Sequence, residues 1–267
     1  MRFFGNSFRR ESRRIRFTGD FASWGEAEGA STGYSTPEIL EKTRVALLKV
    51  KAGDAAFERD SVTFNVMRYE FSLLAGLLRA AMASAGRLSV LDFGGALGSS
   101  YFQCRSFLSD LDELRWSVVD QPAQVACGRK DFANEQLRFY DTVSDCLREQ
   151  QPNVLLLSSV LQYLRSPYEA LADLLRVAIP FVIVERTAFN SSDRDRLTVQ
   201  HVPERIYRAS YPAWFLSETL FRKVFANDYD LICEYKGLDN LHPRNGRAIY
   251  KGFQFQRKSL PPAAKPA

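Results

Sequence analysis

Residues 90–98 have the sequence Val90-Leu91-Asp92-Phe93-Gly94-Gly95-Ala96-Leu97-Gly98, an apolar run that ends in an acid and enters a glycine-rich turn. The apolar run predicts a buried strand over residues 88–93. Glycines permit a tight turn and a close approach of the backbone to a ligand. The segment therefore predicts a strand, a ligand-binding turn and a following helix.

Short apolar runs alternate with helical patterns on the C-terminal side of this segment. Strands are predicted over residues 88–93, 116–119, 137–140, 154–158 and 181–184. Helices are predicted near residues 101–111, 125–132, 143–148 and 167–177. The last helix has its own start signal, Ser166-Pro167-Tyr168-Glu169, which combines a capping box with proline at the first helical position. This alternation predicts a parallel sheet with helices on both faces.

Two more apolar runs, residues 229–235 and 248–256, follow a short helix that Ser217 is expected to cap. No helical segment fits between the two runs, so they are predicted to pair antiparallel. The predicted fold class is α/β and Rossmann-like, with a seven-stranded, mostly parallel sheet that ends in a C-terminal antiparallel hairpin. Such a hairpin is absent from the all-parallel dinucleotide fold, which disfavours an NAD-dependent oxidoreductase.

The remaining segments give the predicted domain organisation. Residues 1–16 form a basic arm, and residues 17–86 an N-terminal helical cap or lid with helices over residues 37–51 and 63–83. The Rossmann-like domain covers residues 87–257, with residues 186–213 as an acceptor-binding insert in a long loop. Residues 258–267 are rich in proline and alanine and are predicted to be disordered.

Composition narrows the class of protein without naming its function. Lys and Arg outnumber Asp and Glu by 36 to 31, and six of these basic residues lie in the arm: Arg2, Arg9, Arg10, Arg13, Arg14 and Arg16. The arm is either a peripheral membrane contact or a solvated extension. Beyond it no basic stripe with interleaved aromatics indicates nucleic-acid binding.

The four cysteines and two histidines show no zinc-ligand spacing, and no metal is predicted. The sequence shows neither a signal peptide nor an apolar run long enough to cross a bilayer. A cytoplasmic location is therefore expected, at the inner face of the membrane if the arm binds lipid.

The turn after Asp92 resembles motif I of class I S-adenosylmethionine-dependent methyltransferases, acid-x-Gly-x-Gly-x-Gly, with Ala96 in place of the middle glycine. Residues 155–164 are similar to the stretch in which an apolar strand of that family gives way to a Val-Leu-x-x-Leu helix under the methionine moiety. The resemblance implies S-adenosyl-L-methionine as the cofactor. The residues expected to bind it are Asp92, Gly94, Gly95, Gly98, Asp120, Gln121, Tyr140, Asp141, Ser158 and Ser159.

Two of these assignments have competing explanations. Asp120 ends the second strand, where a carboxylate can accept both ribose hydroxyls, but NAD-binding folds place an acid there too. Tyr140 and Asp141 end the third strand, where the family contacts the adenine edge, but ordinary polar residues also end strands. The order of the elements along the chain favours S-adenosylmethionine over NAD.

A narrower resemblance covers residues 17–257. It is to a family of bacterial methyltransferases, mostly assigned by similarity, that are often encoded among surface-polysaccharide biosynthesis genes. It rests on Ser23-Trp24, Gly33-Tyr34, Arg59-Asp60-Ser61, residues 91–95, residues 158–164, residues 193–198 and residues 207–212. The resemblance implies O-methylation of a sugar, a glycan or a related small molecule.

Methyl transfer is an in-line displacement, so positioning and exclusion of water are the chief tasks, and a sugar hydroxyl also benefits from a general base. His201 is the first candidate base, with Asp193 and Asp195 as further candidates and His242 as a weaker one. His201 is alternatively a structural loop histidine, and the two aspartates alternatively form surface ion pairs with neighbouring arginines.

Four residues of the insert are predicted to bind the acceptor: Arg205, Tyr207, Arg208 and Tyr211. The arginines offer forked hydrogen bonds, and the tyrosines offer stacking and a hydroxyl, although core packing also explains the tyrosines. Trp24 and Tyr34 either close over the cofactor or anchor their own segment. The alternative function is a non-catalytic binding module that docks to a membrane or to a partner enzyme through the basic arm.

Overall fold

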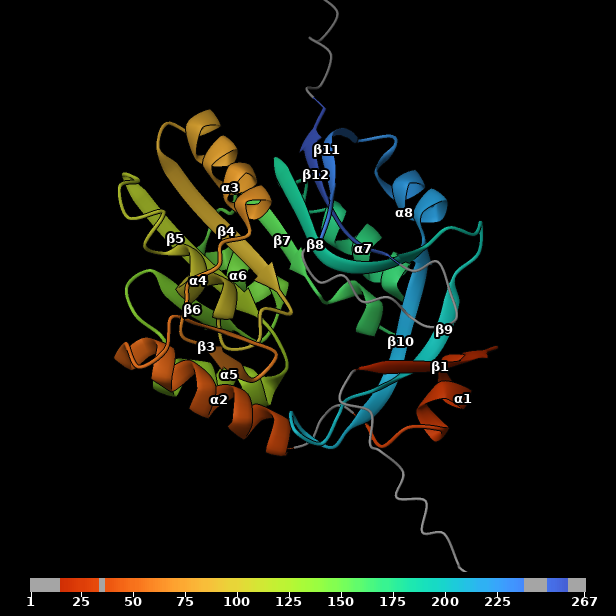
Figure 1. The fold of residues 1–267 in the computed structure, drawn as a ribbon. Helices are drawn as coiled ribbons and strands as arrows, with labels where there is room; N and C mark the ends of the chain where they lie inside the picture. Colours follow the sequence, from red (N-terminus) through yellow and green to blue (C-terminus); the bar gives the residue numbers. More distant parts are fainter. Residues whose placement is uncertain (1–14, 34–36, 238–248, 259–267) are drawn as a thin grey trace, which may run out of the picture.

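The computed structural model describes residues 15–33, 37–237 and 249–258 (Figure 1). Most of the predicted basic arm and nearly all of the tail predicted to be disordered lie outside these residues, as do Tyr34 and His242. Predictions about them stay predictions.

One twisted sheet runs through the molecule. Its seven central strands are Arg87–Phe93 (β4), Glu113–Val119 (β5), Leu137–Tyr140 (β6), Val154–Ser158 (β7), Phe181–Asn190 (β8), Tyr229–Lys236 (β11) and Ile249–Arg257 (β12). Their order is β6-β5-β4-β7-β8-β12-β11. The strands β4 to β8 are mutually parallel, whereas β12 is antiparallel to both β8 and β11. The predicted Rossmann-like fold with its terminal hairpin is confirmed.

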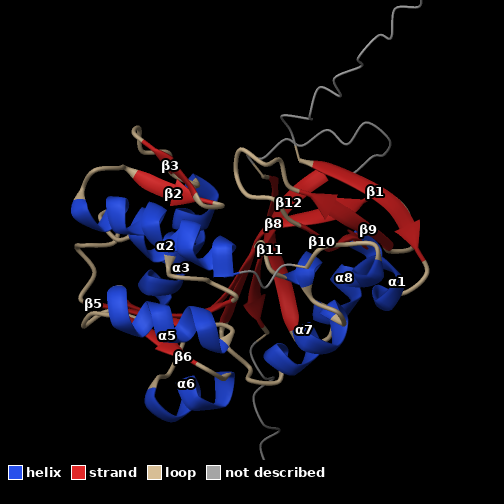
Figure 2. Cartoon of the chain, turned by 90° about the horizontal axis from the view of Figure 1, so that it is seen from below, coloured by secondary structure: helices blue, strands red, loops and turns tan. Residues whose placement is uncertain are grey.

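Helices cover both faces of this sheet (Figure 2). They are Phe71–Ala83 (α3), Ser99–Cys104 (α4), Pro122–Asp131 (α5), Val143–Glu149 (α6), Pro167–Leu175 (α7) and Glu218–Phe225 (α8). Side chains of a strand alternate between faces, so Leu156 of β7 packs in the core beneath α3, α4 and α5. Leu155 and Leu157 pack in the opposite core with α6, α7 and α8.

The helix starts agree with two of the predicted signals. Ser217 caps α8, since its side chain accepts a hydrogen bond from the amide of Leu220. The helix α7 begins at Pro167 as predicted, although within the described structure the Ser166 side chain makes no capping hydrogen bond. The helix predicted near residues 101–111 was placed too far toward the C-terminus, because α4 ends at Cys104.

The segment before β4 differs from the prediction. The helix Pro37–Ala52 (α2) is confirmed, but the helix predicted over residues 63–83 is wrong in its first part. A hairpin of Phe57–Arg59 (β2) and Val62–Phe64 (β3) lies there, and α3 begins only at Phe71. Asp60 and Ser61 form its turn at φ values of 52° and 67°, and the rings of Phe57 and Phe64 stack 4.6 Å apart. Phe64, which fell within the predicted helix, therefore stacks on a cross-strand partner instead.

The insert over residues 186–213 is not the long loop that was predicted. The strand β8 continues to Asn190, and two strands follow, Arg196–His201 (β9) and Ser210–Ser217 (β10). An N-terminal strand, Arg16–Phe21 (β1), pairs antiparallel with β9, and the helix Trp24–Gly29 (α1) packs against β9 and β10. The strand β9 was not predicted because polar Thr198 and Gln200 interrupt its apolar residues. In the structure both are buried.

A bend in β8 joins this second group of strands to the first. Over its first half β8 pairs with β7, but its last residues pair with Leu216 and Ser217 of β10. Between the two halves Arg186 has a φ of 50°, and the pairing with β12 shifts register between Lys251 and Phe253. Such bulges bend a strand and redirect its pairing. The sheet therefore opens between the end of β7 and the pair β9–β10.

None of the helices in the described part of the chain has the length and apolar character needed to cross a bilayer.

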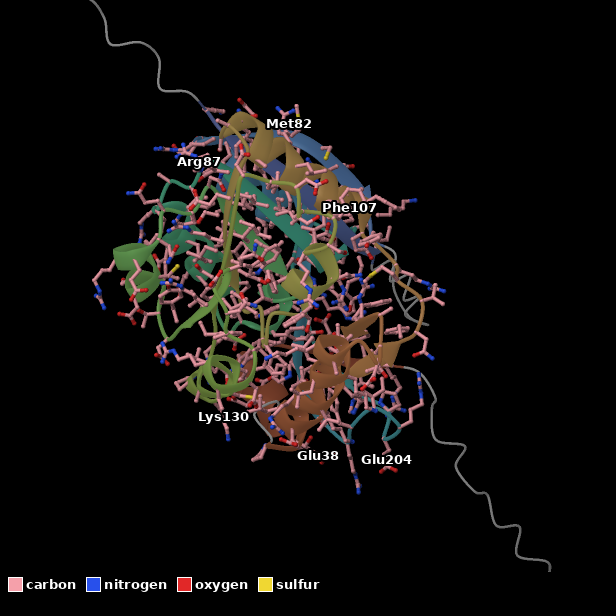
Figure 3. All side chains as sticks on the ribbon, turned by 90° about the vertical axis from the view of Figure 1, so that its left-hand side faces the viewer. Glu38, Met82, Arg87, Phe107, Lys130 and Glu204 are labelled. Atoms are coloured by element: carbon pink, nitrogen blue, oxygen red, sulfur yellow. The ribbon has the colours of Figure 1, made fainter. Side chains whose placement is uncertain are left out.

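We expect Phe221→Ala to lower the free energy of unfolding by about 3–5 kcal/mol, because it empties a fully buried site where Phe189, Phe253 and Phe255 meet. Met82→Ala is the control, since Met82 is 82% exposed on the outer surface of α3 (Figure 3), and should change stability by less than about 0.5 kcal/mol. Urea unfolding measures both. Similar losses in the two variants would contradict the assigned core.

Candidate functional site

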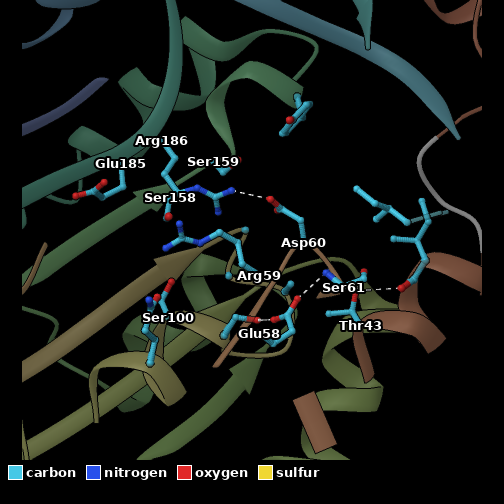
Figure 4. Close-up of a pocket in the computed structure, with 18 of the residues that line it drawn as sticks. Thr43, Glu58, Arg59, Asp60, Ser61, Ser100, Ser158, Ser159, Glu185 and Arg186 are labelled. Carbon is cyan, nitrogen blue, oxygen red and sulfur yellow. Dashed lines mark hydrogen bonds and ion pairs between the residues drawn. The ribbon is translucent and has the colours of Figure 1, made fainter. Parts of the chain in front are cut away.

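A cavity of about 340 Å³ lies at the carboxyl ends of β4 and β7 and beside the bend in β8. Open α/β sheets bind ligands at this edge, and small-molecule sites have volumes of about 300–1,000 Å³. The turn after β4 and the end of β7 form one side, and the β2–β3 hairpin faces them (Figure 4). Residues of β9, β10 and the connection between them complete the lining. The cavity thus occupies the opening that the bend in β8 creates.

The glycine-rich turn has the conformation that its sequence predicted. Gly94, Ala96 and Gly98 all have positive φ, at 74°, 50° and 89°. A Cβ atom at Gly95 would lie 2.5 Å from the carboxylate of Asp92, so a side chain at this position would displace that group. Ala96 thus lies in the left-handed region that favours glycine. The alanine at this position is therefore compatible with the tight turn.

Asp92 is fully buried beneath this turn and lines the cavity. The indole Nε1 of Trp116 donates to its Oδ2 at 2.9 Å, whereas Oδ1 has no hydrogen-bond partner within the described structure. Burial raises the pKa of Asp92 to about 7. A buried carboxylate oxygen without a donor is costly, so Oδ1 is a ready acceptor for a ligand donor.

Asp120, at the end of β5, contacts the same turn. Its Oδ2 accepts from the amide of Ala96 at 2.8 Å and its Oδ1 from the amide of Gln121 at 2.7 Å. The acid and the glycine-rich turn therefore lie together, although Asp120 is behind Ala96 and is not part of the cavity lining. Gln121 is exposed at the start of α5, and Gly98 precedes α4.

Tyr140 and Asp141 lie apart from the cavity. The hydroxyl of Tyr140 donates to Glu149 at 3.0 Å, and Asp141 forms an ion pair with Arg129 at 2.9 Å. Both line a separate hollow beside α6. The structure does not bring them to the glycine-rich turn, whereas it does bring Ser158 and Ser159 to the cavity.

Two further buried carboxyls line the cavity, and sequence reasoning missed both. Glu58 on β2 accepts from the amide of Ser61 at 2.6 Å and from the hydroxyl of Ser99. Glu185 on β8 accepts from the hydroxyl of Tyr235 through Oε1, and its Oε2 has no partner within the described structure. Burial raises the pKa of each to about 7. A signal for Glu185 existed in the sequence, since it follows the apolar run of residues 181–184 as Asp92 follows Val90-Leu91.

Two ion pairs complete the polar lining. Arg186 bonds Asp60 at 2.7 Å, which ties the tip of the β2–β3 hairpin to β8 (Figure 4). Arg59 bonds Glu70 at 3.3 Å. The hairpin is thereby held across the cavity mouth by charge as well as by packing.

Three residues of the insert and Tyr163, which follows β7, form what we call the Tyr–Gln wall, made of Tyr163, Gln200, Tyr207 and Tyr211. The hydroxyl of Tyr163 donates to Gln200 Oε1 at 2.9 Å, and Gln200 Nε2 donates to the Tyr211 hydroxyl at 3.1 Å. The Tyr207 and Tyr211 hydroxyls are 3.3 Å apart. All four residues line the cavity, and Tyr207 and Tyr211 also belong to a buried cluster. The two tyrosines predicted to bind the acceptor are therefore both packed and close to the cavity.

His201 is not among the cavity-lining residues. Its chain neighbours Gln200 and Val202 line the cavity, and alternation along β9 places the His201 side chain on the opposite face of the sheet. There its Nε2 is 2.8 Å from the hydroxyl of Thr18, and burial lowers its pKa, with a smaller effect of Arg16.

The other predicted residues of the insert also lie outside the lining. Asp195 accepts from the Tyr168 hydroxyl at 2.7 Å and from the Ser217 amide at 2.6 Å, which joins β9 to the starts of α7 and α8. Asp193 is exposed in the turn before β9. Arg205 and Arg208 are exposed too, and Arg208 pairs with Glu204 at 3.4 Å.

Trp24 packs its ring 6.3 Å from that of Trp214 on β10 and is not part of the lining, which matches the anchoring explanation.

No protein-family model and no curated protein sequence matches the chain. Solved structures are similar in fold. A magnesium protoporphyrin IX methyltransferase from Synechocystis, with bound S-adenosylmethionine, is 14% identical with a TM-score of 0.46, over 85% of this chain and 87% of that one. The N-terminal domain of EvdMO1, with S-adenosylhomocysteine and D-fucose, is 14% identical with a TM-score of 0.44, over 80% and 97%.

An amino pentose methyltransferase from Micromonospora echinaspora, CalS10, is 11% identical with a TM-score of 0.42, over 70% and 91%. Likenesses of this size concern the fold and not the activity. The strand order β6-β5-β4-β7-β8-β12-β11, with its single reversed strand, agrees with the class I methyltransferase fold expected from the sequence.

We expect the free energy of unfolding to fall as pH rises from about 4 to about 7, because Asp92, Glu58 and Glu185 are more easily protonated in the folded than in the unfolded chain. Below the unfolded pKa the protonated carboxyl gives its full stabilisation, about 3–4 kcal/mol per group. This stabilisation is lost as pH rises through the folded pKa.

Urea unfolding at a series of pH values measures this effect. Glu185→Gln should reduce the slope, while Glu113→Gln, at the partly exposed start of β5, should leave it unchanged. A wild-type stability that rises over this range would contradict the buried environments of the three carboxyls.

Proposed function

We propose that the protein is an S-adenosylmethionine-dependent methyltransferase that methylates a hydroxyl of a small polar acceptor. One observation carries this proposal. The glycine-rich turn after β4 and Ser158–Ser159 line the same cavity as the Tyr–Gln wall. A cofactor site and an acceptor site would therefore share one cavity, as methyl transfer requires.

The residues on the cofactor side fit S-adenosylmethionine. The unpartnered Oδ1 of Asp92 suits the ammonium of the methionine moiety, and the turn over Gly94–Ala96 allows a close approach of the ligand to the backbone. Each oxygen of Asp120 accepts one amide and retains a lone pair for a ribose hydroxyl. When bound, this cofactor supplies an electrophilic methyl group on a sulfonium.

The chain's own residues then align the acceptor and exclude water. The Tyr–Gln wall offers ring faces together with hydroxyl and amide groups, which suits a sugar or a similar polyol. The ion pair of Asp60 with Arg186 holds the β2–β3 hairpin across the site. Arg205 and Arg208 would contact only the parts of a larger acceptor that project from the cavity.

The acceptor belongs, in this proposal, to surface-polysaccharide biosynthesis. The sequence motifs that run from Ser23 to Pro212 support this context, and the neutral, aromatic wall is compatible with it. A cytoplasmic location with contact to the membrane through residues 1–16 is part of the same proposal.

Isothermal titration with S-adenosylhomocysteine tests the cofactor assignment. We expect wild-type protein to bind it, and Asp92→Asn to bind at least about tenfold more weakly, since a charge-assisted hydrogen bond contributes about 1.5–3 kcal/mol. Glu113→Gln is the matched control and should bind as wild type does. Absence of binding by well-folded wild-type protein would reject the proposed function.

Turnover of His201→Ala tests whether this residue is the base. Because His201 faces β1 and not the cavity, we expect its rate to stay within about threefold of wild type, whereas loss of a general base costs about 100-fold or more. Thr18→Ala should behave in the same way. A 100-fold loss confined to His201→Ala would restore His201 as the base.

A further inference from the structure

Glu185 lies next to the cofactor side of the cavity, one strand farther across the sheet. In the parallel pairing of β7 with β8, Ser158 is opposite Glu185. The glycine-rich turn follows β4, which is the neighbour of β7 on its other side. The turn, the end of β7 and Glu185 therefore follow one another along the same edge of the sheet, and all line the cavity (Figure 4).

Only one of the two carboxyl oxygens of Glu185 accepts a hydrogen bond within the part of the chain that the structure describes. The side chain is 1% exposed, Oε1 accepts from the Tyr235 hydroxyl, and Oε2 has no partner within the described residues. Neighbouring ion pairs join Arg186 to Asp60 and Arg59 to Glu70. A structural carboxylate would normally have both oxygens satisfied, because an unmet buried acceptor is costly.

Tyr235 reaches Glu185 by crossing an intervening strand. Tyr235 is on β11, and its cross-strand partner on β12 is Gly252, at the register shift opposite the bend of β8. A Cβ atom at Gly252 would lie 2.3 Å from the Tyr235 ring. Only glycine lets the ring lie across β12 in this way. The bulge, the glycine and the tyrosine together fix the orientation of the Glu185 carboxyl.

We propose, on the basis of the methyltransferase function above, that Oε2 of Glu185 binds the acceptor hydroxyl and takes its proton, and that Tyr235 positions the carboxyl. The acceptor oxygen forms a bond to the methyl carbon as the carbon–sulfur bond breaks, and that electron pair stays on sulfur. The proton that the acceptor oxygen loses passes to the Glu185 carboxylate. No other co-reactant is required.

The electrostatics of the site support this role. Burial raises the pKa of Glu185 to about 7, with the Tyr235 hydroxyl opposing that rise. A base with a pKa near the working pH is ionised in a large fraction of molecules and still accepts a proton readily. The Tyr–Gln wall across the cavity offers neutral hydrogen-bond partners for the remaining hydroxyls of a polyol.

The first measurement separates this inference from the proposed function. S-adenosylhomocysteine should bind Glu185→Gln within about threefold of wild type, because Asp92 and the glycine-rich turn are unchanged. Loss of binding only in Glu185→Gln would assign Glu185 to the cofactor and overturn the inference. A wild-type protein that does not bind would reject the proposed function itself.

The second measurement uses S-adenosylmethionine with glucose, galactose, rhamnose, fucose and glucosamine as acceptor probes. For the best probe, kcat should fall by about 100-fold or more in Glu185→Gln with a smaller change in KM. Wild-type kcat/KM should rise about tenfold per pH unit up to about pH 7 and then level, and this rise should be absent in Glu185→Gln. If glucosamine is the only probe that is methylated, the acceptor group is an amine and not a hydroxyl, which would overturn the inference.

The third measurement tests the positioning role. Tyr235→Phe removes a hydrogen bond that favours the ionised carboxyl, so the midpoint of the pH profile should move to higher pH. The control is Tyr229→Phe, on the same strand, whose hydroxyl donates to the Ile179 carbonyl at 2.9 Å, and it should leave the midpoint unchanged.

A ¹³C NMR titration of the Glu185 carboxyl checks that shift without turnover and applies even to a poorly active variant. An unmoved midpoint in Tyr235→Phe, a rate within threefold of wild type in Glu185→Gln, or no turnover of any probe by cofactor-binding wild-type protein would each overturn the inference.

Discussion

The bend of β8 at Arg186 is the constraint on which the site depends. The strand β7 ends at Ser158, opposite Glu185, and directly beyond this point the positive φ of Arg186 and the register shift in β12 direct the end of β8 to β10. The opening that results is the cavity, and the residues at the bend, Glu185 and Arg186, line it. Strain in the backbone is thus located at the site and maintained by pairing on both sides of it.

The central sheet was predictable because its strands are buried on both faces. Strands such as Val154–Ser158 are continuous apolar runs bounded by turn residues, and this pattern has few alternative explanations. The hairpin β2–β3 and the strand β9 were missed because they are not continuous apolar runs. Their polar residues are satisfied by distant partners, as Gln200 is by Tyr163 and Tyr211, and a single sequence does not show which distant segments meet.

The cofactor side of the site was predictable because its residues lie at the ends of predicted strands or directly after them. The glycine-rich turn, Asp92 and Ser158–Ser159 adjoin predicted strands, and the structure brings them to one cavity. Glu58 lies on β2, where no element was predicted, and the orientation of the Glu185 carboxyl depends on Tyr235 of another strand, which donates to its Oε1. His201 was singled out because it lies in the insert, but strand alternation, invisible while the segment was taken for a loop, directs it to Thr18.

The junction of β8 with β10 has a mechanical consequence. Only two residue pairs, with Leu216 and Ser217, join these strands, whereas β8 and β12 pair along almost their whole length. Because so few backbone pairs cross this junction, the attachment of the β1–β9–β10 unit to the seven-stranded core also depends on side chains. Leu216 belongs to the same buried cluster as Phe189 and Phe221, and the Nδ2 of Asn190 donates to the carbonyl of Phe215 at 2.6 Å.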